Sequence, residues 1–179
     1  MNGLSCQSFT LQPFSPPGAP AVTLRGEIRR DRWLRVSFVL EGELARLDLP
    51  HAAQLPLRQD ELWRRSCFEV FFGPRRRASY WEVNRSPAGH WNVYRFDGYR
   101  KGMREEPRVL GVACRKMEGS AGRYDLAVDL RALELEGTAL AVGISAVLRA
   151  ADTTLSHWAL RHPAPRPDFH HRRGRCLLL

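Results

Sequence analysis

The chain has 179 residues, of which 44% are hydrophobic, and carries a formal net charge of +9. This length suits one domain with a substantial core, and the apolar fraction excludes a chain that is disordered over most of its length. No apolar stretch approaches the length of a membrane span. The positive charge raises nucleic acid as a partner, but the arginines are scattered from Arg25 to Arg175, which favours a solvated basic surface.

The N-terminus and the cysteines indicate a cytoplasmic location. The first residues lack the basic region and apolar core of a signal peptide. The four cysteines are far apart and form no CxxC pair, which argues against a disulfide framework, although one disulfide between distant strands stays open. Cys67 and Cys114 lie in apolar, strand-like runs, and we expect both to be buried.

The first third of the chain is predicted to contain short strands separated by loops. Residues 1–20 combine a strand with a proline-rich lead-in, and residues 21–179 are expected to form a single domain. Segments 22–28 and 33–40 predict a hairpin, because apolar and polar residues alternate in the second arm. A further strand is predicted over 45–49.

The stretch 60–102 is the part of the chain around which the rest is organised. Aromatic residues are interleaved there with carboxylates, an asparagine and arginines. Two apolar runs joined by Gly73 and Pro74, and a third run after Gly89, predict three consecutive strands. Alternation along such strands gives a sheet one packed face and one polar face.

The remainder of the chain continues the β pattern. Further strands are expected over 109–117, 124–130, 139–148 and 176–179. A short helix is predicted over 129–136, with Asp129 as its N-terminal cap. Many short strands with scarcely any helix predict an all-β protein, an antiparallel β-sandwich of the jelly-roll or immunoglobulin-like kind.

The two central strands place carboxylates on one face. Alternation puts Glu69 on one face of its strand, and it puts Glu82 on the same face as Tyr80 and Asn84. Strand pairing can bring Glu69 beside Glu82. Either a strand arginine neutralises the pair, or the carboxylates form a polar floor for a polyhydroxylated ligand. Hydrolysis of a glycoside is a weaker alternative, since the sequence does not give the separation of the carboxyl groups.

The histidines of the tail offer no metal site. No Cys/His spacing matches a zinc motif, and His170 and His171 must point to opposite sides of an extended chain. Histidine with Met103 or Met117 could ligate a haem iron. A catalytic triad can be drawn on paper from Ser66, His162 and Asp97, but no nucleophile-elbow motif supports it.

The central stretch and the tail together resemble a known group of proteins. The segments DELW, SCFEVFF, SYWEVNRSPAGHWNVYRFDGYRKGM and HWALRHPAPRPDFHH resemble bacterial DOMON-like proteins, which are related to family 9 carbohydrate-binding modules. The likeness runs from about Trp33 to the C-terminus. It implies a β-sandwich that binds haem or sugars in a pocket on one sheet. By this resemblance, sugar contacts would fall to Trp63, Glu69, Glu82 and Asn84, and more loosely to Arg95 and Trp158.

The sequence therefore predicts a non-catalytic β-sandwich that binds a small sugar or a sugar-containing ligand. Alternative functions are a haem-binding DOMON-type domain and a basic nucleic-acid-binding module, the latter not favoured. No metal, no membrane association and no cofactor are expected, with haem as the one cofactor left open, and the oligomeric state is not predicted. The candidate ligand-binding residues are Trp63, Glu69, Tyr80, Glu82, Asn84, Arg95, Trp158, His162 and His170.

Overall fold

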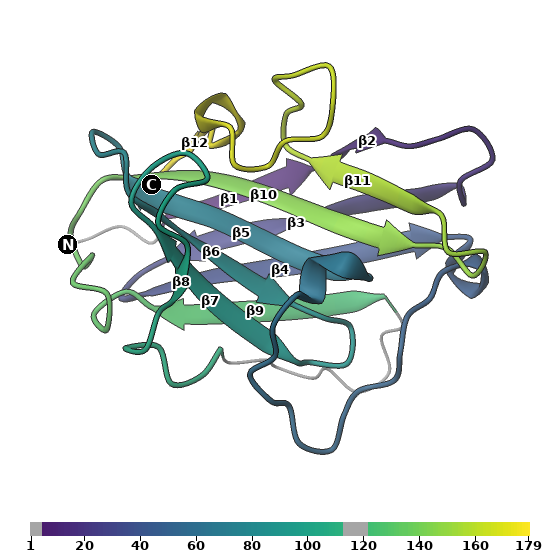
Figure 1. Cartoon of the computed structure of the whole chain (residues 1–179), viewed down its shortest axis with the longest axis horizontal. Helices are drawn as coiled ribbons and strands as arrows, with labels where there is room; N and C mark the ends of the chain where they lie inside the picture. The colour runs from purple at the N-terminus through teal and green to yellow at the C-terminus, as the bar shows by residue number, and fades with distance from the viewer. Residues whose placement is uncertain (1–4, 113–121) are drawn as a thin grey trace.

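Two antiparallel β-sheets packed face to face make up the protein, whose computed structural model describes residues 5–112 and 122–179 (Figure 1). The predicted antiparallel β-sandwich is confirmed. The small sheet has the order β1-β3-β4-β9, with β1 at Ser5–Thr10, β3 at Val22–Arg30, β4 at Trp33–Gly42 and β9 at Arg123–Asp129. Within the described residues, no helix is long and apolar enough to cross a membrane.

The large sheet has the order β2-β11-β10-β5-β6-β7-β8, and β12 also pairs with β10. The three strands predicted within 60–102 form its middle as β5, β6 and β7. The bounds are β2 Gln12–Phe14, β5 Cys67–Pro74, β6 Tyr80–Arg85, β7 Trp91–Phe96, β8 Arg104–Glu105, β10 Leu140–Arg149, β11 Leu155–Ala159 and β12 Leu177–Leu178.

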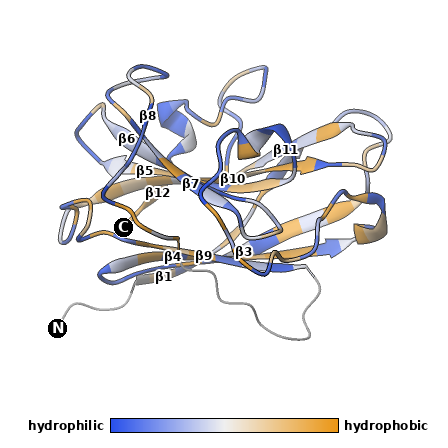
Figure 2. Ribbon diagram, turned by 60° about the horizontal axis from the view of Figure 1, so that its bottom comes forward, coloured by the Kyte–Doolittle hydropathy of each residue, from blue (hydrophilic) through white to orange (hydrophobic). Residues whose placement is uncertain are grey.

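The main core lies between the sheets, where the apolar residues of both layers face each other (Figure 2). Phe38 of β4 meets Phe68 of β5 with ring centroids 5.0 Å apart. Trp81 and Val83 of β6 are buried in the same core. Each such side chain contributes about 1.5–3 kcal/mol by leaving water. Because side chains alternate along a strand, Glu82, which lies between Trp81 and Val83, points to the outer face of the large sheet.

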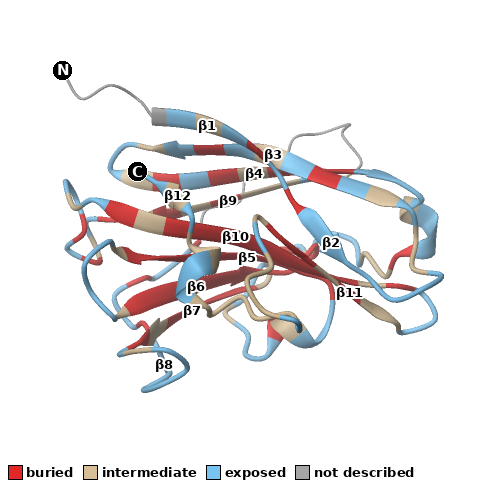
Figure 3. Cartoon of the chain, turned by 90° about the horizontal axis from the view of Figure 1, so that it is seen from above, coloured by how far each residue is buried: buried red, intermediate tan, exposed pale blue. Residues whose placement is uncertain are grey.

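The large sheet is buried on both faces, and the small sheet on only one. Every residue of Cys67–Gly73 and Tyr80–Arg85 is buried, whereas β3 and β4 alternate between buried and exposed positions (Figure 3). A second apolar cluster of Phe71, Tyr80, Tyr94 and Phe96 covers the outer face of the large sheet, with Trp63 and Phe169 packed against it. The loop before β5 and the C-terminal tail therefore turn this face into an interior.

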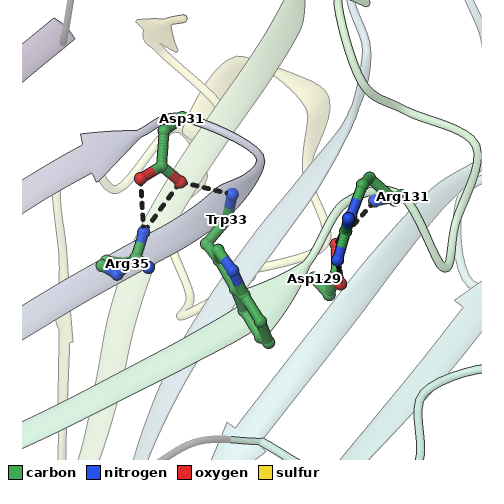
Figure 4. Close-up of polar contacts among 5 residues, drawn as sticks. All are labelled: Asp31, Trp33, Arg35, Asp129 and Arg131. Carbon is green, nitrogen blue, oxygen red and sulfur yellow. Dashed lines mark hydrogen bonds and ion pairs between the residues drawn. The ribbon is translucent and has the colours of Figure 1, made fainter.

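The predicted hairpin over 22–40 is confirmed as β3 and β4. Its turn is held by Asp31, whose Oδ1 accepts the backbone N–H of Trp33 at 2.5 Å and an N–H of Arg35 at 2.7 Å (Figure 4). An aspartate that accepts from the backbone two residues on forms a tight local turn. The turn sets the register that directs Leu34, Val36 and Phe38 into the core.

The helix predicted over 129–136 is wrong. Asp129 does not cap a helix; its Oδ1 accepts the backbone N–H of Arg131 at 2.9 Å, and its other oxygen pairs with the Arg131 guanidinium (Figure 4). The chain continues in turns, with Glu134 at a φ of 58°. Local side-chain bonding to the backbone competes with a helix, and a left-handed residue ends one.

Two predicted strands are also absent or only partly described. Residues 45–49 form a 3₁₀ turn, η1 at Leu44–Arg46, followed by a single bridge from Leu47 to Ala150. Of the segment 109–117, residues 109–112 form no strand, and the rest, with Cys114, lies outside the described residues. Cys67 is buried, as predicted.

Candidate functional site

A cavity of about 390 Å³ lies on the outer face of the large sheet. Strands β5, β6, β7, β10 and β11 form its floor, while the 3₁₀ turn η2 (Leu62–Arg64), the loop after β7 and the C-terminal tail form its walls. It is lined by Trp63, Glu69, Phe71, Glu82, Phe96, Arg100, Met103, Val147, His157, Pro167, Phe169 and His170. This volume falls in the range of small-molecule sites.

Two buried carboxyl groups lie at the bottom of the cavity. Glu69 is 2% exposed and Glu82 is 4% exposed. The register pairs Glu69 with Asn84 and Phe71 with Glu82, so the two glutamates are diagonal neighbours rather than directly opposite. The predicted proximity of the pair is present, and no arginine forms an ion pair with either one in the described part of the chain.

Burial keeps these carboxyl groups from ionising freely. Burial, with repulsion from Glu82 as the second cause, raises the pKa of Glu69 well above its usual value. Burial also raises the pKa of Glu82 to about 7, against a hydrogen bond from the Asn84 amide at 2.8 Å, which lowers it. The pair therefore holds at least one proton near neutral pH, and it can both donate and accept hydrogen bonds.

A row of unsatisfied polar atoms crosses the sheet at Glu69. The register aligns Ser145 of β10, Glu69 of β5 and Asn84 of β6 side by side. The Oγ of Ser145, Oε1 of Glu69 and Oδ1 of Asn84 are all buried without a hydrogen-bond partner. A buried polar atom left without a partner costs about 1–3 kcal/mol. Of the three residues, Glu69 lines the cavity, and Ser145 and Asn84 lie beside it on the neighbouring strands. Glu69 is therefore where a ligand rich in hydroxyl groups could meet this row.

His170 of the tail is held above this row by Tyr80. The backbone N–H of Arg100 donates to the Tyr80 hydroxyl at 3.3 Å, and that hydroxyl is hydrogen-bonded to Nδ1 of His170 at 2.8 Å. The other ring nitrogen, Nε2, lies 3.8 Å from Oε2 of Glu82. Burial lowers the pKa of His170 to about 4, so the ring is neutral at pH 7.

Aromatic rings form the walls of the cavity. Trp63 is half-buried and meets Tyr94 edge-on, with ring centroids 5.5 Å apart. Phe169 of the tail faces Phe71 of β5 at 6.3 Å. Such rings offer flat apolar surfaces beside the polar floor, the combination that binds the apolar face and the hydroxyl groups of a sugar.

Three predicted site residues lie elsewhere. Arg95 lies on the core side of β7, with its guanidinium 5.5 Å from the Trp81 ring. Trp158 belongs to the main core, where its indole N–H donates to Ser156 at 3.0 Å. His162 donates to the carbonyl of Gln12 at 2.9 Å, beside β2. Alternation explains the first two, because the neighbours of Arg95 and Trp158 are the residues that face outward.

Six of the nine predicted residues come together around the cavity. Trp63, Glu69, Glu82 and His170 line it, Tyr80 positions His170, and Asn84 bonds Glu82. Other residues that line the cavity were not predicted from the sequence and are placed there by the topology, namely Phe96, Arg100, Val147, His157, Pro167 and Phe169. Phe96 lies two residues after Tyr94, on the same face of β7, so the alternation of side chains could have identified it. The others depend on how β10, β11 and the tail are placed.

Two larger concavities are less suited to a ligand. One of about 560 Å³ covers the outer face of the small sheet, where Arg25 pairs with Glu41 and Arg29 with Glu27 in exposed ion pairs. Another of about 490 Å³ lies beside the loop before β5. The second is lined by the buried Ser66 and Ser86, and the Oγ of Ser86 has no hydrogen-bond partner, but among the described residues neither concavity is lined by a buried carboxyl group like that of Glu69.

Other chemistries find no support in the described residues. No group of three or more metal-ligating side chains occurs in them. The three residues of the catalytic triad considered from the sequence have separate partners. Ser66 donates to the carbonyl of Asp48, Asp97 pairs with Arg104, and His162 donates to the carbonyl of Gln12. The fold and site thus define an antiparallel β-sandwich with a polar-floored, aromatic-walled cavity on one sheet.

Comparisons with known proteins agree with this fold. No family model and no curated protein matches the chain. Its structure is similar to the crystal structure of a "putative carbohydrate-binding protein" from Bacteroides uniformis, with a TM-score of 0.58 and 14% sequence identity over 93% of this chain and 83% of that one. At this identity the likeness establishes the fold.

Proposed function

We propose that this protein is a non-catalytic module that binds a small sugar or a sugar-containing ligand in the cavity over Glu69 and Glu82. The observation that carries the proposal is the cavity-lining Glu69, whose buried Oε1 has no hydrogen-bond partner, beside the rings of Trp63, Phe71 and Phe169. Sugar hydroxyl groups can donate to this carboxyl group, and the neighbouring rings can stack on the sugar. The carbohydrate-binding description of the structural neighbour supports the same ligand class.

The sequence resemblance gives the finer form of this proposal, a DOMON-like domain related to family 9 carbohydrate-binding modules. The placement of Trp63, Glu69, Glu82 and Asn84 together supports it. The non-catalytic part of the proposal rests on the structural neighbour, whose description is carbohydrate-binding.

The direct test is calorimetric titration with a panel of mono- and disaccharides, accompanied by fluorescence of the cavity residue Trp63. We expect binding by at least one sugar, and a loss of about tenfold or more in affinity on Glu69→Gln. Glu136→Gln, the same substitution at an exposed residue that does not line the cavity, serves as the control. No heat and no fluorescence change across the panel, for folded protein, would refute the proposal. Product sugars appearing on incubation with disaccharides would refute its non-catalytic part.

Haem is the alternative ligand for the same cavity, because Met103, His157 and His170 all line it. Met103 is 46% exposed, whereas Tyr80 already bonds Nδ1 of His170 and leaves Nε2, 3.8 Å from Oε2 of Glu82, as the nitrogen that could bind iron. Haem binding predicts a Soret band on reconstitution that Met103→Leu weakens. The absence of the band at equimolar haem would eliminate this alternative.

A further inference from the structure

A second, smaller cavity of about 220 Å³ is lined by arginines. It lies where the connection from β5 to β6 meets the tail around η3 (Arg172–Gly174). Arg75 and Arg77 contribute from the connection, Arg172 and Arg175 from the tail, and Ser79 adds a hydroxyl group. No carboxylate lines this cavity.

The charge of these arginines is not compensated by the protein. None of the four forms an ion pair within the described residues, although most charged arginines elsewhere on the surface have a carboxylate partner, as Arg104 has Asp97. Nη1 of Arg175 is buried without a hydrogen-bond partner. Burial, with repulsion from Arg172, lowers the pKa of Arg175. Like charges gathered around an unsatisfied donor favour an anion between them.

The cavity is fixed by contacts between the tail and the sheet. Arg172 donates to the carbonyl of Arg75 at 3.0 Å, which joins the tail to the connection. The tail approaches β10 so closely that a Cβ on Gly143 would lie 3.0 Å from the carbonyl oxygen of Gly174. The Arg175 guanidinium lies 4.3 Å from the centre of the Tyr80 ring. These contacts hold two of the guanidinium groups in place before any ligand arrives, which reduces the entropic cost of binding.

We propose that this four-arginine cavity binds the phosphate group of a small ligand. Guanidinium groups bind phosphate oxygens through paired N–H donors, and the Ser79 hydroxyl supplies a further donor. The small volume suits a single phosphate or a diphosphate group, whereas the backbone of a nucleic acid needs a longer open groove. This site goes beyond the proposed sugar cavity and does not depend on it, since the residues that line the two cavities are different.

The test is calorimetric titration with inorganic pyrophosphate at constant ionic strength, on two double variants of equal charge. Arg172→Gln with Arg175→Gln changes two lining residues. Arg76→Gln with Arg173→Gln changes their sequence neighbours, which do not line the cavity. We expect the first pair to weaken binding at least tenfold and the second pair to leave it within about twofold.

A third double variant controls for a folding defect in Arg172→Gln with Arg175→Gln. Arg75→Gln with Arg77→Gln removes two exposed lining side chains, leaves the hydrogen bond of Arg172 to the Arg75 carbonyl in place, and should weaken pyrophosphate binding in the same way without affecting thermal unfolding. Equal losses in the lining and neighbouring pairs would mean a general attraction of a basic surface for anions and would overturn the proposal. So would the absence of pyrophosphate binding, or tighter binding of single-stranded RNA that survives loss of the lining arginines.

Discussion

The outer faces of the two sheets differ in whether their charged residues are exposed and paired or buried and unpaired. On the small sheet, Arg25 and Glu41 face water and form an exposed ion pair at 2.9 Å. On the large sheet, Glu69 and Glu82 are buried beneath the tail and have no arginine partner among the described residues. Exposed ion pairs contribute little, about 0–1 kcal/mol. Buried carboxyl groups without a cation destabilise the fold, unless a ligand or a proton compensates them.

This contrast indicates which face of the sandwich carries the candidate functional site. The small sheet follows the pattern that folding alone requires, with apolar residues inside and charged residues outside. On its outer face the large sheet departs from that pattern, because buried carboxyl groups and aromatic rings line a cavity there. Local departures of this kind are expected at functional sites. The following predictions test the contrast in order of expected effect.

Phe71→Ala should show that the outer face of the large sheet is an interior. Phe71 is fully buried against Tyr80, Phe169 and His170, so we expect a loss of about 3–5 kcal/mol in the free energy of unfolding. Val39→Ala, at a half-buried outward position of the small sheet, should cost about 1 kcal/mol or less. Urea unfolding measures both. Similar small losses would mean that the tail covers the sheet only loosely.

The dependence of stability on pH should expose Glu82 and His170 as opposing contributions. Glu82 titrates near 7 when folded and 4.5 when unfolded, so its contribution is lost as the pH rises through this window. His170 titrates near 4 when folded and 6.5 when unfolded, so its contribution is lost as the pH falls through that window. Each can reach about 3 kcal/mol. Glu69, whose pKa burial raises well above its usual value, contributes with the same sign as Glu82, so the two acids together oppose His170.

Removing either group should therefore reveal the other. Glu69→Gln with Glu82→Gln, which removes both acids, is expected to become less stable as the pH falls from 6.5 to 4, and His170→Gln to become less stable as the pH rises from 4.5 to 7. Urea unfolding at pH 4, 5.5 and 7 measures both slopes. Parallel curves for the two variants and the unmodified protein would contradict the assignment of these pKa shifts.

Glu69→Gln should separate stability from binding. At pH 8 we expect the variant to gain about 1–3 kcal/mol, because a neutral amide replaces a buried acid with an unpartnered oxygen. Its new N–H can reach toward the free oxygen of Asn84, its cross-strand neighbour. The matched change Glu41→Gln on the small sheet should alter stability by less than about 1 kcal/mol. Thermal unfolding measures both, and a destabilised Glu69→Gln would contradict the contrast between the faces.

The strand pattern predicted a large part of the site. Period-two alternation separated Phe68, Trp81 and Val83 from Glu69 and Glu82, and the structure has the same division. Where the rule was not applied, the prediction failed: alternation in Trp91–Phe96 puts Arg95 on the side of Val93 and leaves Phe96 facing outward. The helix over 129–136 failed for another reason, because the chain after Asp129 continues in turns and reaches a left-handed conformation at Glu134, with a φ of 58°.

What the sequence determined by itself is local: the strands, their two faces, and the side of β5 and β6 on which the carboxyl groups lie. These follow from backbone geometry, which makes successive side chains alternate. Only the tertiary structure decided that β10 lies beside β5, which places Ser145 next to Glu69, and that the tail returns to set His170 over Glu82. Such contacts join residues about 76 and 88 positions apart, and they depend on burial summed over the whole sandwich rather than on any local pattern.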